Sequence, residues 1–232
     1  MDMLTDKHAA AVVGEVVAAN TTGFTAQCPR SLLYAPPVFG AFVRILTAPA
    51  SVGASAVEQV IDPFADAPTP AGLPAWVPDG TLYAVVYSAA TGTAEPGRRP
   101  TAYGLDEDEL RRQQPQIFDL LATEFSALHV GYARAGRFRA GIPPRPARLH
   151  AAVTDCAPDE VCALTEQPEL LRALVKSPPD VPADELIVAC ILHAYACRDE
   201  EYAYLVRAGK QLANLLRDDP DRLMALLGRL EP

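Results

Sequence analysis

The first half of the chain alternates between short apolar runs and turn residues, a pattern typical of β-strands. Strands are expected within 11-AVVGEVVAANTTGFTAQCP-29 and at 40–48, and the clearest strand is 81-TLYAVVYSAATG-92. A last short strand is expected at 101–104. The intervening stretch 49–80 is rich in Ala, Pro, Ser and Asp, which indicates an insertion. Several short strands joined by turn residues favour a small β-barrel or sandwich.

In the second half of the chain the apolar period becomes that of α-helices. A short helical turn is expected at 106–113, where Asp106 and Glu109 form a capping-box-like pair. Pro115 would break that helix, so the main helix is expected at 116–133. Further helices are expected at about 147–155, 158–175, 182–197, 199–217 and 219–230.

These patterns predict an α+β protein, with a small N-terminal β-barrel followed by a C-terminal all-helical domain. Residues 1–104 would form the barrel, which carries the 49–80 insertion, and residues 105–232 the helical domain. The 232 residues are enough for two small domains with their own cores. Half of the residues are apolar and 21% are charged, which is typical of a folded globular chain.

The charge balance and the cysteines narrow the functional classes. A net charge of −9 argues against a protein coated in basic residues for general nucleic-acid binding, although a local basic patch remains compatible with it. The five cysteines are irregularly spaced, and we identify no leader and no apolar run long enough to span a bilayer. We therefore expect a cytoplasmic protein with reduced thiols and no membrane insertion.

Motifs of nucleotide-dependent or hydrolytic enzymes are not found in the sequence. No P-loop, Rossmann fingerprint, GxSxG elbow or HExxH motif occurs. Cys190, His193 and Cys197 share one face of an apolar helix, but zinc ligands usually come in close pairs, so core packing is the preferred interpretation. We predict no catalytic residue, no metal and no cofactor.

A cluster of arginines is the strongest candidate site for binding. Five arginines follow one another without an intervening acid: Arg134, Arg137, Arg139, Arg145 and Arg148. Arginine forks bind phosphate or carboxylate groups, and the adjacent Tyr132 and Phe138 are candidates for stacking on bases. Two interpretations remain open. The cluster is either neutralised by acidic surface, of this chain or of a protein partner, or it binds nucleic acid; the excess of carboxylates favours the first.

A second, smaller basic site is Arg98 with Arg99, beside Gly97. The two arginines could bind an anion or a partner. The Pro96–Gly97 pair is also a common turn, and a turn whose arginines pair with nearby carboxylates is the favoured interpretation.

Several segments of the chain resemble the HAS-barrel proteins. They are 12-VVGEVVAANTTGFTAQCP-29, 83-YAVVYSAATGTAEPGRRP-100, 102-AYGLDEDELRRQQPQIFDLL-121, 142-IPPRPARLH-150 and 203-AYLVRAGKQLANLL-216. This barrel is named for its occurrence at the N-terminus of HerA-type DNA-translocating ATPases and of ATP synthase catalytic subunits. The chain is most similar to a stand-alone form that lacks the ATPase motor. The resemblance implies a barrel used for assembly or docking, and it transfers no catalytic residue.

Three functions follow from these observations, in order of preference. The first is a non-enzymatic assembly or adaptor protein that docks through its barrel onto itself or onto a ring ATPase. The second is a nucleic-acid-binding accessory factor of DNA-processing machinery that uses the cluster 134–148. An enzyme ranks last, because no nucleophile–base pair or metal set is visible.

Overall fold

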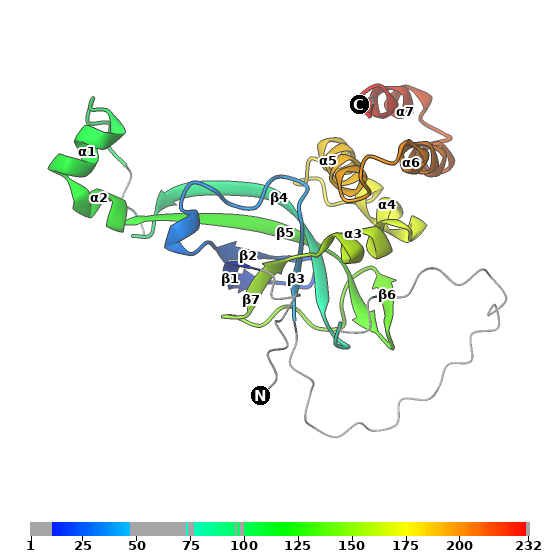
Figure 1. Ribbon diagram of the computed structural model, residues 1–232, viewed down its shortest axis with the longest axis horizontal. Coiled ribbons are helices and arrows are strands. Elements are labelled where there is room, and N and C mark those ends of the chain that lie inside the picture. The colour runs from blue at the N-terminus through cyan, green and yellow to red at the C-terminus, as the bar shows by residue number, and fades with distance from the viewer. Residues whose placement is uncertain (1–10, 47–72, 74–76, 96, 98–99, 231–232) are drawn as a thin grey trace, which may run out of the picture.

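The computed structural model describes residues 11–46, 73, 77–95, 97 and 100–230, and the expected insertion at 49–80 lies almost wholly outside them (Figure 1). The strands of the described residues are β1 (Val12–Ala19), β2 (Gly23–Gln27), β3 (Phe42–Ile45), β4 (Leu82–Thr93), β5 (Leu121–Arg134), β6 (Arg137–Ala140) and β7 (Ala152–Asp155). They form one antiparallel sheet in the order β2-β1-β7-β3-β4-β5-β6.

One further pairing, of β2 with β5, joins the first strand of this order to a strand near its other end. β2 pairs with residues 124–128 of β5, so each strand from β1 to β5, and β7, has at least two neighbours. Followed from β5 through β4, β3, β7, β1 and β2, the pairing order returns to β5. Within the described sheet, β6 pairs with β5 alone.

The helices are a 3₁₀ turn (Arg30–Leu32), α1 (Glu107–Gln113), α2 (Pro115–Asp119), α3 (Pro158–Thr165), α4 (Pro168–Val175), α5 (Ala183–Ala196), α6 (Tyr202–Leu215) and α7 (Pro220–Leu227). The protein is therefore a mixed α+β structure. Asp106 caps α1 by accepting a hydrogen bond from the Glu109 amide at 2.7 Å, as expected. Pro168 begins a new helix, so the helix expected at 158–175 is divided into α3 and α4.

The main helix expected at 116–133 is wrong. After the short α2, this stretch forms β5, which pairs with β4 along nearly its whole length, with β2 in its middle and with β6 at its C-terminal end. The spacing of Leu121, Phe125 and Leu128 is that of one helix face, whereas in the strand Phe125 and Leu128 point to opposite sides of the sheet, so the local pattern favoured the wrong element. Pairing with β2 and β4, which are distant in sequence, makes this segment a strand.

Two smaller elements also differ from expectation. The helix expected at 147–155 is instead strand β7, which lies between β1 and β3. The strand expected at 101–104 is irregular chain. Residues 105–232, expected to be all helical, therefore contain β5, β6 and β7, and the continuous helical part begins only at Pro158.

Two apolar clusters are packed on opposite sides of the sheet, because neighbouring residues of a strand point to opposite faces. On β4, Leu82, Ala84 and Val86 belong to the inner cluster, whereas Tyr83 and Val85 belong to the helix-facing cluster. The inner cluster lies among strands and includes Val16, Phe24, Val43, Phe125, Ala127 and Val153. The helix-facing cluster includes Leu164, Leu170, Leu174, Leu186, Ile187 and Ile191 from α3, α4 and α5.

The connection between β4 and β5 extends away from the rest of the molecule. Figure 1 shows α1 and α2 at the far end of this long hairpin, remote from α3–α7. We call residues 91–123, which comprise the outer ends of β4 and β5 with α1 and α2, the arm. The 3₁₀ turn supports its base, since Arg30 forms an ion pair with Asp119 at 2.7 Å.

Candidate functional site

The hairpin of β5 and β6 carries three of the predicted arginines on a single face. Arg134 lies directly opposite Arg137, and Tyr132 lies directly opposite Arg139. Directly opposed residues of an antiparallel pair share one face of the sheet. We call Tyr132, Arg134, Arg137 and Arg139 the arginine face.

Phe138 does not belong to this face. It lies opposite Ala133, and its ring packs edge-on against Tyr83 with centroids 5.9 Å apart, within the helix-facing cluster. Of the two aromatic residues predicted to stack on bases, only Tyr132 lies beside the arginines. Its ring is half-buried and packs against the inner cluster.

The arginine face is exposed and carries no counter-charge from the part of the chain that the structure describes. Arg134, Arg137 and Arg139 are exposed, and none forms an ion pair or side-chain hydrogen bond with any residue the structure describes. Asp79 is the acid at this hairpin, and it accepts a hydrogen bond from the Gly136 amide in the turn at 3.3 Å. The cluster is therefore not neutralised by the carboxylates of the described chain.

The remaining predicted arginines lie elsewhere. Arg145 and Arg148 are exposed in the connection from β6 to β7, which is anchored by the buried Ala147 in the inner cluster. Neither forms an ion pair within the described ranges. Arg98 and Arg99 lie outside the described residues.

The arm carries a second candidate site, which the sequence did not reveal. An open cavity of about 390 Å³ is lined by residues of α1, α2 and the connection before α1, and by Tyr34, which follows the 3₁₀ turn. Its rim includes Tyr34, Tyr103 and Leu105, whose exposed fractions are 55%, 50% and 37%. Its floor is formed by Leu110, Ile117 and Phe118. Large apolar side chains gathered around an open hollow are typical of protein-docking surfaces.

The charges on α1 are arranged with opposite signs at its two ends. Glu107, Asp108 and Glu109 occupy its first turn, and Arg111 and Arg112 its last. Arg111 pairs with Glu107 at 2.7 Å and also lies over the Phe118 ring, 4.2 Å from its centroid. The helix therefore presents both signs of charge beside the apolar cavity.

A buried polar cluster joins the sheet to the helices but has no access to solvent. Arg44 on β3 forms an ion pair with Glu160 on α3, and the Tyr83 hydroxyl donates to the same carboxylate at 3.0 Å. Burial, and then the negative charge of Glu160, raise the pKa of Tyr83 well above its usual range. All three side chains are almost fully buried, so this cluster holds the fold together and does not form a reaction site. A lone arginine in the apolar strand 42-FVRI-45 was the sequence signal for it.

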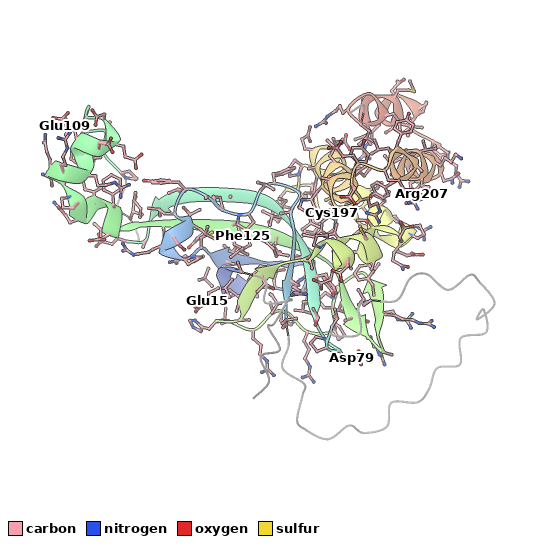
Figure 2. All side chains as sticks on the ribbon, in the orientation of Figure 1. Glu15, Asp79, Glu109, Phe125, Cys197 and Arg207 are labelled. Carbon is pink, nitrogen blue, oxygen red and sulfur yellow. The ribbon has the colours of Figure 1, made fainter. Side chains whose placement is uncertain are left out.

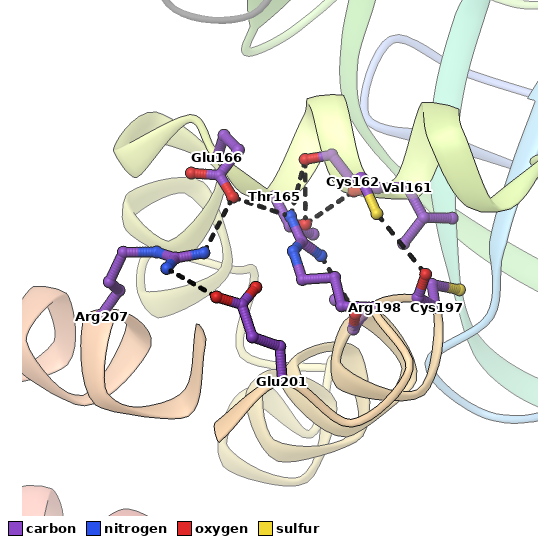
Figure 3. A network of polar contacts seen from close by, with 9 residues as sticks. Val161, Cys162, Thr165, Glu166, Cys197, Arg198, Glu201 and Arg207 are labelled. Carbon is purple, nitrogen blue, oxygen red and sulfur yellow. Dashed lines mark hydrogen bonds and ion pairs between the residues drawn. The ribbon is translucent and has the colours of Figure 1, made fainter. Parts of the chain in front are cut away.

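A second polar network links the helices to one another (Figure 3). Arg198 donates to the Cys162 carbonyl at 2.8 Å and to Glu166 at 3.1 Å. Its guanidinium also lies 4.1 Å from the centre of the Tyr204 ring. Arg207 approaches the same Glu166 from the solvent side, at 3.3 Å. Arg198, Arg207 and Glu166 thus pair with one another or with the Cys162 carbonyl, and none of these three side chains is directed at a ligand.

The cysteines and histidines form no reactive site in the part of the chain that is described. Burial raises the pKa of every cysteine thiol, so little thiolate is present at neutral pH. Cys190 packs against Gly40 and His193 against the Phe42 ring. Among described residues no group of three His, Cys, Asp or Glu could hold a metal ion. No helix in the described ranges has the length and apolar character needed to cross a bilayer.

Comparison with known proteins leaves the family open. No protein-family model matches the chain, and no curated protein matches it significantly. The resemblance to the HAS-barrel proteins therefore stays a prediction.

Proposed function

We propose that this protein is a non-enzymatic assembly or adaptor protein, whose sheet is a HAS-like β-barrel and whose arm is the docking element. The observation that carries this proposal is the open apolar cavity on the arm, with Tyr34, Tyr103 and Leu105 at its rim. Burying such side chains stabilises a complex by roughly 25 cal/mol per Å² of apolar surface. Without a partner, the exposed side chains of Tyr34, Tyr103 and Leu105 stay in contact with water.

The strand pairings support the barrel part of the proposal. The pairing order returns to β5 through the contact of β2 with β5, as it does in a sheet that closes on itself. The inner cluster, which includes Val16, Phe125 and Val153, then corresponds to the interior of a small barrel filled by side chains. A filled interior leaves docking to the outer surface and to the arm.

The preferred partner of the arm is a second copy of the chain. A two-fold interface brings the same surface of both subunits together, so it requires a self-complementary patch. Helix α1 has acids at one end and arginines at the other, so two antiparallel copies would place Glu107 and Asp108 near the partner's Arg111 and Arg112. A ring ATPase is the other partner that the resemblance suggests.

The absolute mass in solution, measured by light scattering over a range of concentrations, tests this proposal. We expect a dimer or a higher closed oligomer that dissociates when Tyr103 and Leu105 are both replaced by Ser. The matched control replaces Tyr202 and Met224 by Ser, two side chains of comparable exposure on α6 and α7. A monomer at all concentrations that also fails to bind a ring ATPase, or an oligomer unaffected by Tyr103→Ser/Leu105→Ser, would contradict it.

A further inference from the structure

We infer that the arginine face, Tyr132 with Arg134, Arg137 and Arg139, binds the phosphate backbone of a single-stranded nucleic acid. This inference goes beyond the docking role proposed for the arm and rests on different residues. Its basis is a set of exposed guanidinium groups that have no ion-pair partner among the described residues and are held in fixed register on a two-stranded ribbon.

The register places the three arginines as neighbours. Arg134 and Arg137 are directly opposed, so their Cβ atoms are about 5 Å apart. Arg139 follows Arg137 two residues along β6, which separates same-face side chains by roughly 7 Å. Each guanidinium can form two parallel hydrogen bonds with one phosphate group. The face therefore offers consecutive phosphate positions on one surface.

The charge distribution leaves this face without a counter-charge among the described residues. The chain has 29 acidic and 20 basic residues, so carboxylates are plentiful for pairing. Several arginines of the helices pair in this way, as Arg111 does with Glu107, Arg207 with Glu166 and Arg222 with Asp184. The arginine face does not, and like charges placed directly opposite each other destabilise a sheet. A bound polyanion removes that repulsion.

Tyr132 favours nucleic acid over an acidic peptide as the occupant. Its ring lies on the same face as the arginines, opposite Arg139, and is only half-buried. Aromatic rings flanked by arginines allow bases to stack without regard to sequence, and unstacked bases are available in single strands. An acidic peptide would pair with the arginines but would not require the aromatic ring of Tyr132 beside them.

The position in the fold leaves this face accessible. The opposite side of the ribbon is covered, since Phe138 packs against Tyr83 beneath the helices. β6 is a sheet edge, and Figure 1 shows it far from α1 and the arm. Figure 2 likewise shows Asp79, at this ribbon, and Glu109, on α1, at opposite ends of the molecule. The two proposed surfaces can therefore be occupied together.

Fluorescence anisotropy with a labelled oligothymidine of about 20 nucleotides, at about 50 mM and about 200 mM salt, tests the inference with the full chain. We compare the wild type with Arg134→Gln/Arg137→Gln/Arg139→Gln. The charge-matched control is Lys210→Gln/Arg217→Gln/Arg229→Gln, which removes three exposed cations from α6, the α6–α7 connection and the end of α7. A poly-glutamate peptide of equal charge and a DNA duplex are measured in parallel, and circular dichroism checks that each variant is folded.

We expect the wild type to bind oligothymidine more tightly than duplex or poly-glutamate, with an affinity that falls steeply with salt. The triple variant should bind at least about tenfold more weakly, and its salt slope should fall by about 2, which corresponds to three lost phosphate contacts. Tyr132→Leu should weaken oligothymidine binding while leaving the salt slope unchanged. The inference is overturned if the wild type does not bind at low salt, if both triple variants lose affinity equally, or if poly-glutamate or duplex is preferred.

Discussion

Arg44 on β3 and Glu160 on α3 form an ion pair across the boundary between sheet and helices, with only 2% and 0% of their side chains exposed. The carboxylate also accepts from the Tyr83 hydroxyl at 3.0 Å and from the Ala157 amide at 2.9 Å. Glu160 is thus hydrogen-bonded on both oxygens. The pair fixes the start of α3 on the face of the sheet that the helices cover.

Removing one member of this pair should destabilise the protein strongly. Glu160→Gln leaves the Arg44 guanidinium buried without its counter-charge, so we expect the free energy of unfolding to fall by about 3–5 kcal/mol. Chemical denaturation measures the change. Glu107→Gln, which breaks the exposed pair with Arg111, serves as control and should cost less than about 1 kcal/mol. Equal effects of the two substitutions would show that the buried pair has no special structural role.

His129 should make stability depend on pH. It lies on β5 with 5% of its surface exposed, and neither ring nitrogen has a hydrogen-bond partner among the described residues. Burial lowers its pKa to about 4, below the value of 6.5 that applies to the unfolded chain. Between about pH 4 and pH 6.5, His129 therefore binds a proton in the unfolded chain but not in the folded chain. Stability is therefore lost as the pH falls from about 6.5 to about 4, by up to about 3 kcal/mol.

The difference between the wild type and His129→Leu isolates this contribution, because the other titrating groups are common to both. Urea unfolding at several pH values between 4 and 7 should show that the variant loses less stability on acidification. His150→Asn, in the exposed turn before β7, serves as the control at a histidine on the surface. Parallel curves for wild type and His129→Leu would rule out His129 as the source.

Gly40 should not tolerate a side chain. Its φ of +82° is unfavourable for other residues, and a Cβ there would lie 2.5 Å from the Ala189 Cβ on α5. Gly104 is the matched control, since its φ is +70° and nothing lies within 4 Å of a Cβ built there. Gly104→Ala should cost about 1–2 kcal/mol from backbone strain alone, and Gly40→Ala about 1–3 kcal/mol more from overpacking. Thermal unfolding of both variants measures this. Similar melting temperatures would mean that α5 moves away without cost.

Arg198 and Arg207 should differ in their contributions although both pair with Glu166. The Arg198 side chain is 7% exposed and serves two backbone carbonyls and the Tyr204 ring, whereas that of Arg207 is 45% exposed. Arg198→Ala should therefore lower the free energy of unfolding by about 2–3 kcal/mol, and Arg207→Ala by less than about 1 kcal/mol. The same denaturation experiment ranks the two, and a reversed order would contradict the burial argument.

The local sequence predicted an element correctly where the residues of that segment are enough to determine its structure. The apolar run in 81-TLYAVVYSAATG-92 predicted β4, and the helices expected from 158 and 219 begin at α3 and α7, where Asp219 accepts from the Arg222 amide at 3.2 Å. Capping and proline effects act within a few residues, so they are readable without the fold.

The candidate site was only partly visible in the sequence. The arginines stand out by composition, but their register and the opposite orientation of Phe138 depend on the β5–β6 pairing. The helix expected at 116–133 would have placed Tyr132 on a helix and left the arginines in the connection that follows it. The arm cavity escaped notice because Tyr34 and Tyr103, which both line it, are far apart in the sequence and come together only in the folded chain.

By itself the sequence determined the α+β class, the strands before residue 93, most of the final helices and the presence of an arginine-rich segment. Only the tertiary structure decided that residues 121–134 and 152–155 are strands. Both segments pair on two sides with strands distant in sequence, and that long-range hydrogen bonding outweighs a weak local preference. The β5–β6 hairpin assembles the arginine face, because which side chains share a face is decided only once the register is set.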